Sequence, residues 1–260
     1  MKTIPVTKLR NFKNELDKFK SPTKEHLRIL EDYNRYNNYT NLIDLYKKSK
    51  EAFFEYQNID ESFLPSNLDH RESLPVFEEI DTTSTTQDAI SVLQKRNPEI
   101  HVDDSDYNFK YIQREVPTCR TPKTEFEAGI KKSGAGGIDF IGFNVNDKLP
   151  ILGEIKVKSD KNAFYALIQL LMYLSELSTP SQIERIMKNN PFENISEFPS
   201  KKSFYLYIIL VFSEYGKLKQ QILTETKKLA ARLEQDIQEI EKIVFLKMHP
   251  INKEEIITKI

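Results

Sequence analysis

The 260-residue chain has a single cysteine, Cys119, and no long apolar segment. One thiol excludes an intramolecular disulfide and is usual in a reducing compartment. The N-terminus lacks the apolar core of a signal peptide, and the longest apolar run, Phe204 to Phe212, is about half of the roughly 20 residues that cross a bilayer. We therefore expect a soluble, cytoplasmic protein with no membrane association.

Histidine and glycine are also scarce. The four histidines are dispersed and lack the spacing of a zinc site, so we expect surface or loop positions for His26, His70, His101 and His249. Six of the seven glycines fall between residues 129 and 153. This clustering indicates that the backbone there makes a close approach or adopts an unusual φ angle.

The formal net charge is −1, but the charges are distributed unevenly. Residues 1–59 carry 12 basic and 8 acidic side chains, residues 60–106 carry 3 and 12, and residues 107–260 carry 23 and 19. The two basic blocks permit contact with a polyanion such as a nucleic acid, although lysines most often form solvated helix surfaces.

Hydrophobic periodicity divides the chain into three parts. Residues 1–59 are expected to form a helical module, because apolar residues recur at three- and four-residue steps. Residues 60–86 lose this pattern and are rich in acids, as in a surface connection. Residues 87–260 alternate between helix and strand patterns, which indicates an α/β fold with a mixed sheet flanked by helices. The expected elements are helices at 87–95, 162–177, 181–188 and 218–241, and strands at 107–118, 138–145, 150–158, 203–213 and 243–248.

Charged side chains interrupt two of these strands. Alternation places Glu154 and Lys156 on the same face of one strand, about 7 Å apart at Cβ. The preceding strand carries Asp139 among apolar residues, and an antiparallel hairpin can bring it opposite Glu154. Two carboxylates at that spacing repel each other unless a cation lies between them, which suits Mg²⁺ or Mn²⁺. The alternative is a solvent-facing Glu–Lys pair and an aspartate that belongs to a turn.

The following helix contains a glutamine, Gln169, among apolar residues, with Tyr165 and Tyr173 one turn away on either side. A buried amide destabilises the fold unless it is hydrogen-bonded, so a partner is expected. A backbone carbonyl would satisfy it as well as a polar group of a functional site.

Three short motifs in this region, Gly136-Gly-Ile-Asp139, Gly153-Glu-Ile-Lys156 and Gln169-x-x-x-Tyr173, resemble those of the PD-(D/E)XK nuclease superfamily, in its RecB-like or Cas4-like branch with a QxxxY motif. The resemblance covers roughly residues 107–215. It implies a restriction-endonuclease-like core, to which residues 1–59 would be an N-terminal helical extension.

The resemblance also implies a role for each residue of the motifs. Asp139, Glu154 and the backbone carbonyl of Ile155 would bind Mg²⁺ or Mn²⁺. Lys156 would orient or help to deprotonate the attacking water, Gln169 would position the site or the substrate, and Tyr173 would support it. Phosphodiester hydrolysis needs a metal to lower the pKa of water and to neutralise charge that builds on the phosphate, which agrees with this set.

The sequence departs from the family's pattern in two places. Ile138 stands where many members have a proline before the aspartate. Many members also carry a further acid or a histidine on a helix before the first core strand, and Glu79, Asp88, Glu125 and Glu127 are all candidates for it here. A site that operates with one metal is the alternative.

We therefore expect a metal-dependent deoxyribonuclease, with RNA as the less favoured substrate. The first alternative is a catalytically silent nuclease-fold protein that acts as a nucleic-acid-binding or assembly module. The second is an unrelated α/β protein with a chance match, in which Asp139 and Glu154 would lie far apart. The sequence leaves open endo- versus exonucleolytic cleavage, sequence specificity, the pathway, the role of the N-terminal helices and whether the protein forms a homo-oligomer.

Overall fold

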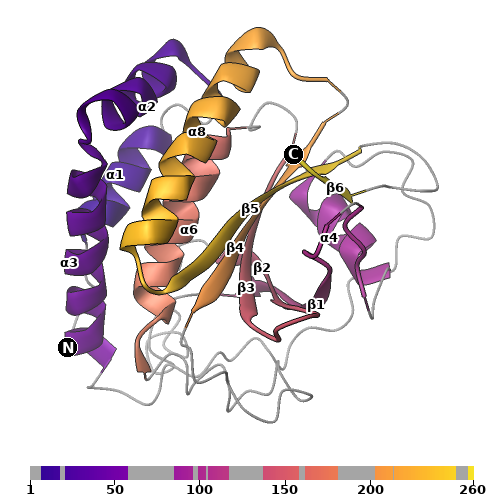
Figure 1. Ribbon diagram of the computed structural model, residues 1–260. Helices are drawn as coiled ribbons and strands as arrows, with labels where there is room; N and C mark the ends of the chain where they lie inside the picture. Colours follow the sequence, from indigo (N-terminus) through magenta and orange to yellow (C-terminus); the bar gives the residue numbers. More distant parts are fainter. Residues whose placement is uncertain are drawn as a thin grey trace, which may run out of the picture.

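The computed structural model describes residues 7–17, 21–57, 85–95, 99–103, 105–116, 137–157, 162–180, 203–212, 214–249 and 257–260. Their central feature is a six-stranded sheet in which the strands lie in the order β1-β2-β3-β4-β5-β6 (Figure 1). The strands are β1 (Phe109–Val116), β2 (Ile138–Asn144), β3 (Pro150–Lys156), β4 (Phe204–Val211), β5 (Ile240–Met248) and β6 (Ile257–Lys259).

The sheet is mixed, because it contains both antiparallel and parallel strand pairs. β2 and β3 pair antiparallel through a short turn, and β1 also pairs antiparallel with β2. β3, β4 and β5 are parallel, and the crossovers that join them contain helices. Every residue of β4 is buried, because helices cover both faces of the sheet at its centre. The expected α/β fold with a mixed sheet is confirmed, and the finer expectation of a restriction-endonuclease-like core stays a prediction.

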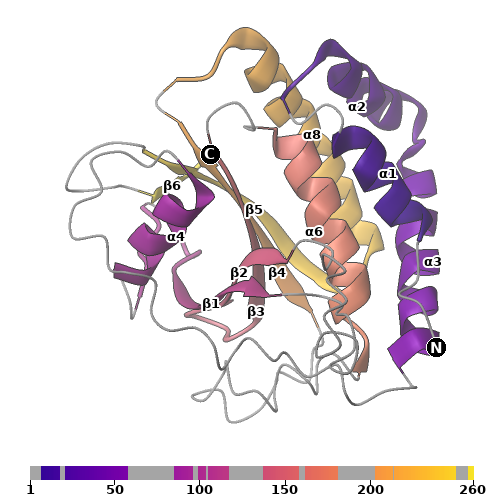
Figure 2. The same ribbon diagram turned by 180° about the vertical axis from the view of Figure 1, so that it is seen from behind.

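Helices cover the two faces unequally. α6 and α8 lie on one face and are themselves covered by the three N-terminal helices, while α4 lies on the other face (Figures 1 and 2). The N-terminal helices contribute Leu9, Leu30 and Leu42 to the same apolar core as the sheet and α6. The described helices are α1 (Lys8–Asp17), α2 (Lys24–Tyr36), α3 (Tyr39–Gln57), α4 (Thr86–Lys95), α6 (Ala163–Leu177) and α8 (Lys217–Asp236).

The helical character of the N-terminal part is thus confirmed. The division of the chain at residues 59 and 60 stays a prediction, because the acidic connection falls almost entirely outside the described residues, as does the helix expected at 181–188. In the part of the chain that is described, no helix is long and apolar enough to cross a membrane.

The end of α8 was predicted wrongly. The helix ends at Asp236, and Ile240 already belongs to β5, although the apolar periodicity of the sequence continues through both Ile237 and Ile240. The amide of Ile237 makes the last helical bond, to the Leu233 carbonyl, and the Glu234 carboxylate then accepts the amide of Ile243. Long-range strand pairing with β4 therefore overrides a local helical pattern. The sequence also gave no indication of β6.

The expectation for His26 was wrong as well. Its side chain is only 1% exposed and lies at the start of α2. There its Nδ1 accepts the backbone amide of Thr23, while the Thr23 hydroxyl accepts the amide of His26, so the two residues form a reciprocal capping box. His101 is exposed and His249 half-buried, whereas His70 lies outside the described residues.

Candidate functional site

The hairpin of β2 and β3 brings the two strand motifs together. Phe140 pairs with Gly153, and Gly142 pairs with Ile151. A side chain at Gly153 would overlap with the Phe140 ring, and a Cβ at Gly142 would lie 2.5 Å from the carbonyl oxygen of Lys110 in β1. The clustered glycines thus permit close backbone approach at these two positions, as predicted.

Asp139 lies where the ladder between β2 and β3 ends. The last ladder pair is Phe140 and Gly153, so the same register continued by one residue would place Asp139 opposite Glu154. Instead of a further ladder bond, the Oδ2 atom of Asp139 accepts the backbone amide of Ile155 at 2.7 Å. In a strand the carbonyl of a residue points to the same side as its amide, so the Ile155 carbonyl also faces the Asp139 edge. Asp139 and Glu154 therefore lie on adjacent strands rather than far apart, and the resemblance itself stays a prediction.

Glu154 and Lys156 are buried rather than exposed to solvent. They share the face of β3 that α6 covers, as the hydrogen bond from Lys156 to Gln169 of α6 shows, and they are 2% and 8% exposed. The Nζ atom of Lys156 donates to Glu154 Oε1 at 2.7 Å and to Gln169 Oε1 at 2.6 Å. It also lies 4.9 Å from the ring centroid of Tyr165. The alternative of a solvent-facing ion pair is wrong, and the expected partner of Gln169 is Lys156 of the adjacent strand.

The helix α6 packs over this site. Its first turn is fixed by Asn162, whose side-chain oxygen accepts the amide of Tyr165 at 3.2 Å. One turn beyond Gln169, Tyr173 is 2% exposed. Burial raises the pKa of the Tyr173 phenol well above its ordinary value, and the carboxylates of Glu154 and Asp139 raise it further. Tyr173 therefore stays protonated and can donate a hydrogen bond within the site.

The carboxyl of Glu154 is only half satisfied. Burial is the largest influence on it and raises its pKa, against the opposing effect of the Lys156 ammonium. Its Oε1 atom accepts from Lys156, but its Oε2 atom is buried and has no hydrogen-bond partner among the described residues. A buried carboxylate oxygen without a partner destabilises the fold unless a water molecule or an ion satisfies it.

A fourth charge reaches the site from outside the three motifs. Lys13 of α1 lies with its Nζ atom 5.8 Å from the ring centroid of Tyr165, and its charge acts to lower the pKa of Glu154. Sequence reasoning missed Lys13, because no local pattern connects an N-terminal lysine with strands more than a hundred residues later. Only the packing of α1 against α6 reveals it.

The donor set fits a hard divalent cation in part. Asp139, the unpartnered oxygen of Glu154 and the Ile155 carbonyl are all oxygen donors, which Mg²⁺ and Mn²⁺ prefer. No group of three or more acidic, histidine or cysteine side chains able to hold a metal occurs in the described ranges. Two protein carboxylates suffice for Mg²⁺, which keeps several of its waters.

The further acid is not found among the described candidates. Asp88 accepts the amide of Thr85 at 2.6 Å and so caps α4, which packs on the face of the sheet opposite to Glu154 and Lys156. Glu79, Glu125 and Glu127 lie outside the described residues.

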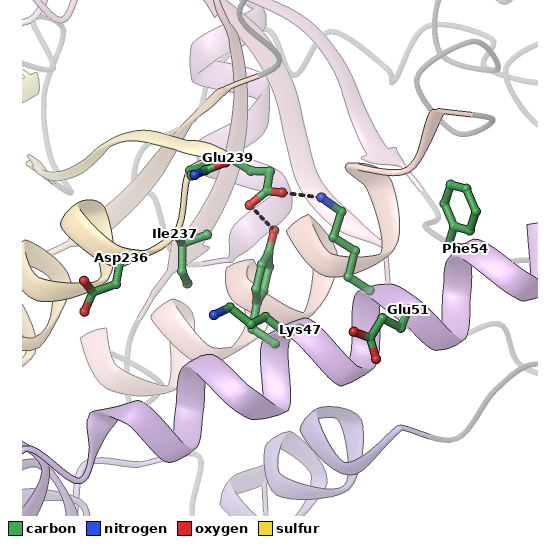
Figure 3. A pocket seen from close by; sticks show the side chains of 9 residues that line it. Lys47, Glu51, Phe54, Asp236, Ile237 and Glu239 are labelled. Atoms are coloured by element: carbon green, nitrogen blue, oxygen red, sulfur yellow. Dashed lines mark hydrogen bonds and ion pairs between the residues drawn. The ribbon is translucent and has the colours of Figure 1, made fainter.

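A separate cavity lies at the other end of the parallel strands (Figure 3). It has a volume of about 540 Å³ and is formed by α3 and by the turn between α8 and β5. Its acid, Glu239, pairs with Lys50 through one oxygen and accepts the hydroxyl of Tyr46 at 3.2 Å through the other. Both oxygens of this carboxylate therefore have a hydrogen-bond partner, whereas Glu154 has a partner at only one.

Comparisons with protein-family models, with curated proteins and with solved structures found no match to this chain. The interpretation of the site therefore depends on its own chemistry.

Proposed function

We propose that the protein is a metal-dependent nuclease that hydrolyses phosphodiester bonds in DNA, with RNA the less favoured substrate. One observation carries the proposal. Asp139, Glu154, Lys156 and Gln169 meet at the end of the β2–β3 ladder, and one buried oxygen of Glu154 has no hydrogen-bond partner in the described part of the chain.

In this proposal, Asp139, Glu154 and the Ile155 carbonyl hold Mg²⁺ or Mn²⁺. The bound ion would lower the pKa of a water molecule and offset charge on the phosphate. The Oδ2 atom of Asp139 accepts the Ile155 amide, so the backbone of β3 helps to orient this carboxylate. This fixed orientation is what a ligand set needs if no reorganisation is to accompany the reaction.

Lys156 and Gln169 act as a pair. Gln169 holds the Lys156 ammonium at 2.6 Å, so the cation remains in place when Glu154 turns toward a metal. Lys156 then orients the attacking water and stabilises negative charge on the phosphate. Tyr173, which remains protonated, supports Gln169 and the substrate from the next turn of α6.

The test combines metal binding with cleavage. Calorimetric titration with Mn²⁺ should show stoichiometric uptake by the wild-type protein and none by the Glu154→Gln variant. Labelled single-stranded DNA, double-stranded DNA and RNA, incubated with Mn²⁺, identify the substrate, and the products should carry 5′-phosphate ends. The Asp139→Asn and Lys156→Met variants should each lose about 100-fold or more in cleavage rate.

Asp106→Asn is the matched control, because Asp106 is exposed and lies away from the β2–β3 ladder end. This variant should retain both metal uptake and cleavage. Cleavage that persists in Asp139→Asn and Lys156→Met would overturn the proposal. A wild-type protein that binds DNA but neither takes up Mn²⁺ nor cleaves would instead be the binding or assembly module.

A further inference from the structure

We propose that Lys13 of the N-terminal helix α1 binds a backbone phosphate of the substrate, next to the phosphate that reacts. This inference rests on the proposed nuclease function and deepens it, since it assigns a substrate-binding role to a helix outside the three motifs. The N-terminal helices would then be part of the active site rather than a separate appendage.

The position of α1 is firmly set. Arg10 forms an ion pair with Glu176 of α6, whose side chain is fully buried. Leu9 and Leu16 enter the core beneath the helix, and Ser49 of α3 links Thr7 to Ser175 through hydroxyl hydrogen bonds of 3.1 and 2.9 Å. α1 is thus fixed against α6 at both its start and its middle, which makes Lys13 a pre-positioned cation.

Lys13 and Lys156 lie against the same aromatic ring. Their Nζ atoms are 5.8 Å and 4.9 Å from the Tyr165 centroid. Lys156 is buried and bound to Glu154 and Gln169, whereas Lys13 is half-buried. One ammonium therefore belongs to the interior of the site and the other to its rim.

A cation at the rim of a phosphodiesterase site has an evident ligand. The substrate carries a negative charge at every nucleotide, so a strand with one phosphate near Lys156 must place neighbouring phosphates near the surface around it. Lysine binds phosphate as a point charge, and such a contact fixes the position of the strand without reading its sequence. Residues 1–59 carry an excess of basic over acidic side chains, which adds to the attraction.

The experiment measures cleavage kinetics at several salt concentrations, with Mn²⁺ and the DNA substrate that the wild-type protein cuts best. For Lys13→Gln we expect KM to rise about 5- to 10-fold while kcat stays within about twofold of the wild-type value. The slope of log(1/KM) against log[salt] should become less steep by about one, as the loss of one phosphate contact requires. Lys13→Arg should restore most of the affinity, because it retains the charge.

Lys8→Gln is the matched control, since it removes the same charge from the same helix. Lys8 is exposed and lies roughly 140° around the helix from Lys13. Thermal unfolding of each variant confirms that the fold is intact. If Lys13→Gln matches Lys8→Gln in KM and in salt slope, or if it lowers kcat with KM unchanged, the assignment is wrong while the nuclease function stands. If the wild-type protein cleaves no substrate, the proposed function fails and the assignment fails with it.

Discussion

The buried pair of Glu154 and Lys156 should add little or nothing to the stability of the fold. At an effective dielectric constant of about 20, opposite charges at their 2.7 Å separation attract by roughly 6 kcal/mol. Removing both ions from water costs several kcal/mol each, so the two contributions nearly cancel. The raised pKa of Glu154 supports this balance, because burial there outweighs the Lys156 ammonium.

A double-mutant cycle tests this argument. The variants are Glu154→Leu, Lys156→Met and the combination of the two, and the free energy of unfolding is measured by urea denaturation at pH 7. Each single variant leaves one buried charge without its main partner and should be destabilised by about 3 kcal/mol. The double variant removes both charges and should lie within about 1 kcal/mol of the wild-type protein, or above it.

Activity supplies the second half of the test. The double variant should be stable but inactive, because in the proposed function the pair serves catalysis rather than stability. If the double variant is less stable than either single variant, the pair is a structural ion pair and the reasoning fails. A fully active double variant would refute it equally.

Four further predictions concern the dependence on pH and the packing of the fold. Burial raises the pKa of Glu154, and only the ionised carboxylate binds a metal, so Mn²⁺ affinity should increase as the pH rises through that raised pKa. Calorimetric titration with Mn²⁺ across the range from pH 5 to 8 measures this increase. A Mn²⁺ affinity that does not change with pH would show that Glu154 is not a ligand. Because the pKa of Glu154 is higher in the folded protein than in the unfolded chain, protonation of Glu154 stabilises the fold. This stabilisation is fully present below the pKa of the unfolded chain and is lost as the pH rises through the pKa of the folded protein. Gly153→Ala should cost about 1–3 kcal/mol, because its methyl would overlap with the Phe140 ring, whereas Gly216→Ser, at an open N-cap position of α8, should be neutral or stabilising by a few tenths of a kcal/mol in the same denaturation assay. Arg10→Ala should cost about 3 kcal/mol in that assay, because it leaves Glu176 buried without its counter-charge, and a loss below about 0.5 kcal/mol would show that α1 is not anchored there.

Local patterns in the sequence predicted the parts of the site that depend on one element or on adjacent elements. Alternation with a period of two placed Glu154 and Lys156 on one face, and a short hairpin placed Asp139 opposite them. Both inferences needed only neighbouring strands. The same type of reasoning was misled at Ile240, where a helical period continued by coincidence into β5.

Features that depend on distant packing could not be predicted. The approach of Lys13 to Tyr165 follows from how α1 docks on α6, and the sequence does not encode that docking in any local period. The burial of His26 follows from its contact with Phe164, whose ring centroid lies 6.3 Å away. The further acid of the site is undetermined for a related reason, since three of its candidates lie outside the described residues.

Two buried glutamates, Glu176 of α6 and Glu154 of β3, differ in how their carboxylates are satisfied. Glu176 is fully buried, is paired with Arg10 and leaves no oxygen without a partner. Glu154 is nearly as buried, yet one of its oxygens has no partner in the described part of the chain, although Gln169 and Tyr173 lie nearby. If both carboxylates had only to be satisfied within the core, both oxygens of Glu154 would be expected to have partners, as those of Glu176 do. Under the proposed function, a metal ion would take the place of the missing partner at this oxygen of Glu154, beside Asp139 and the Ile155 carbonyl.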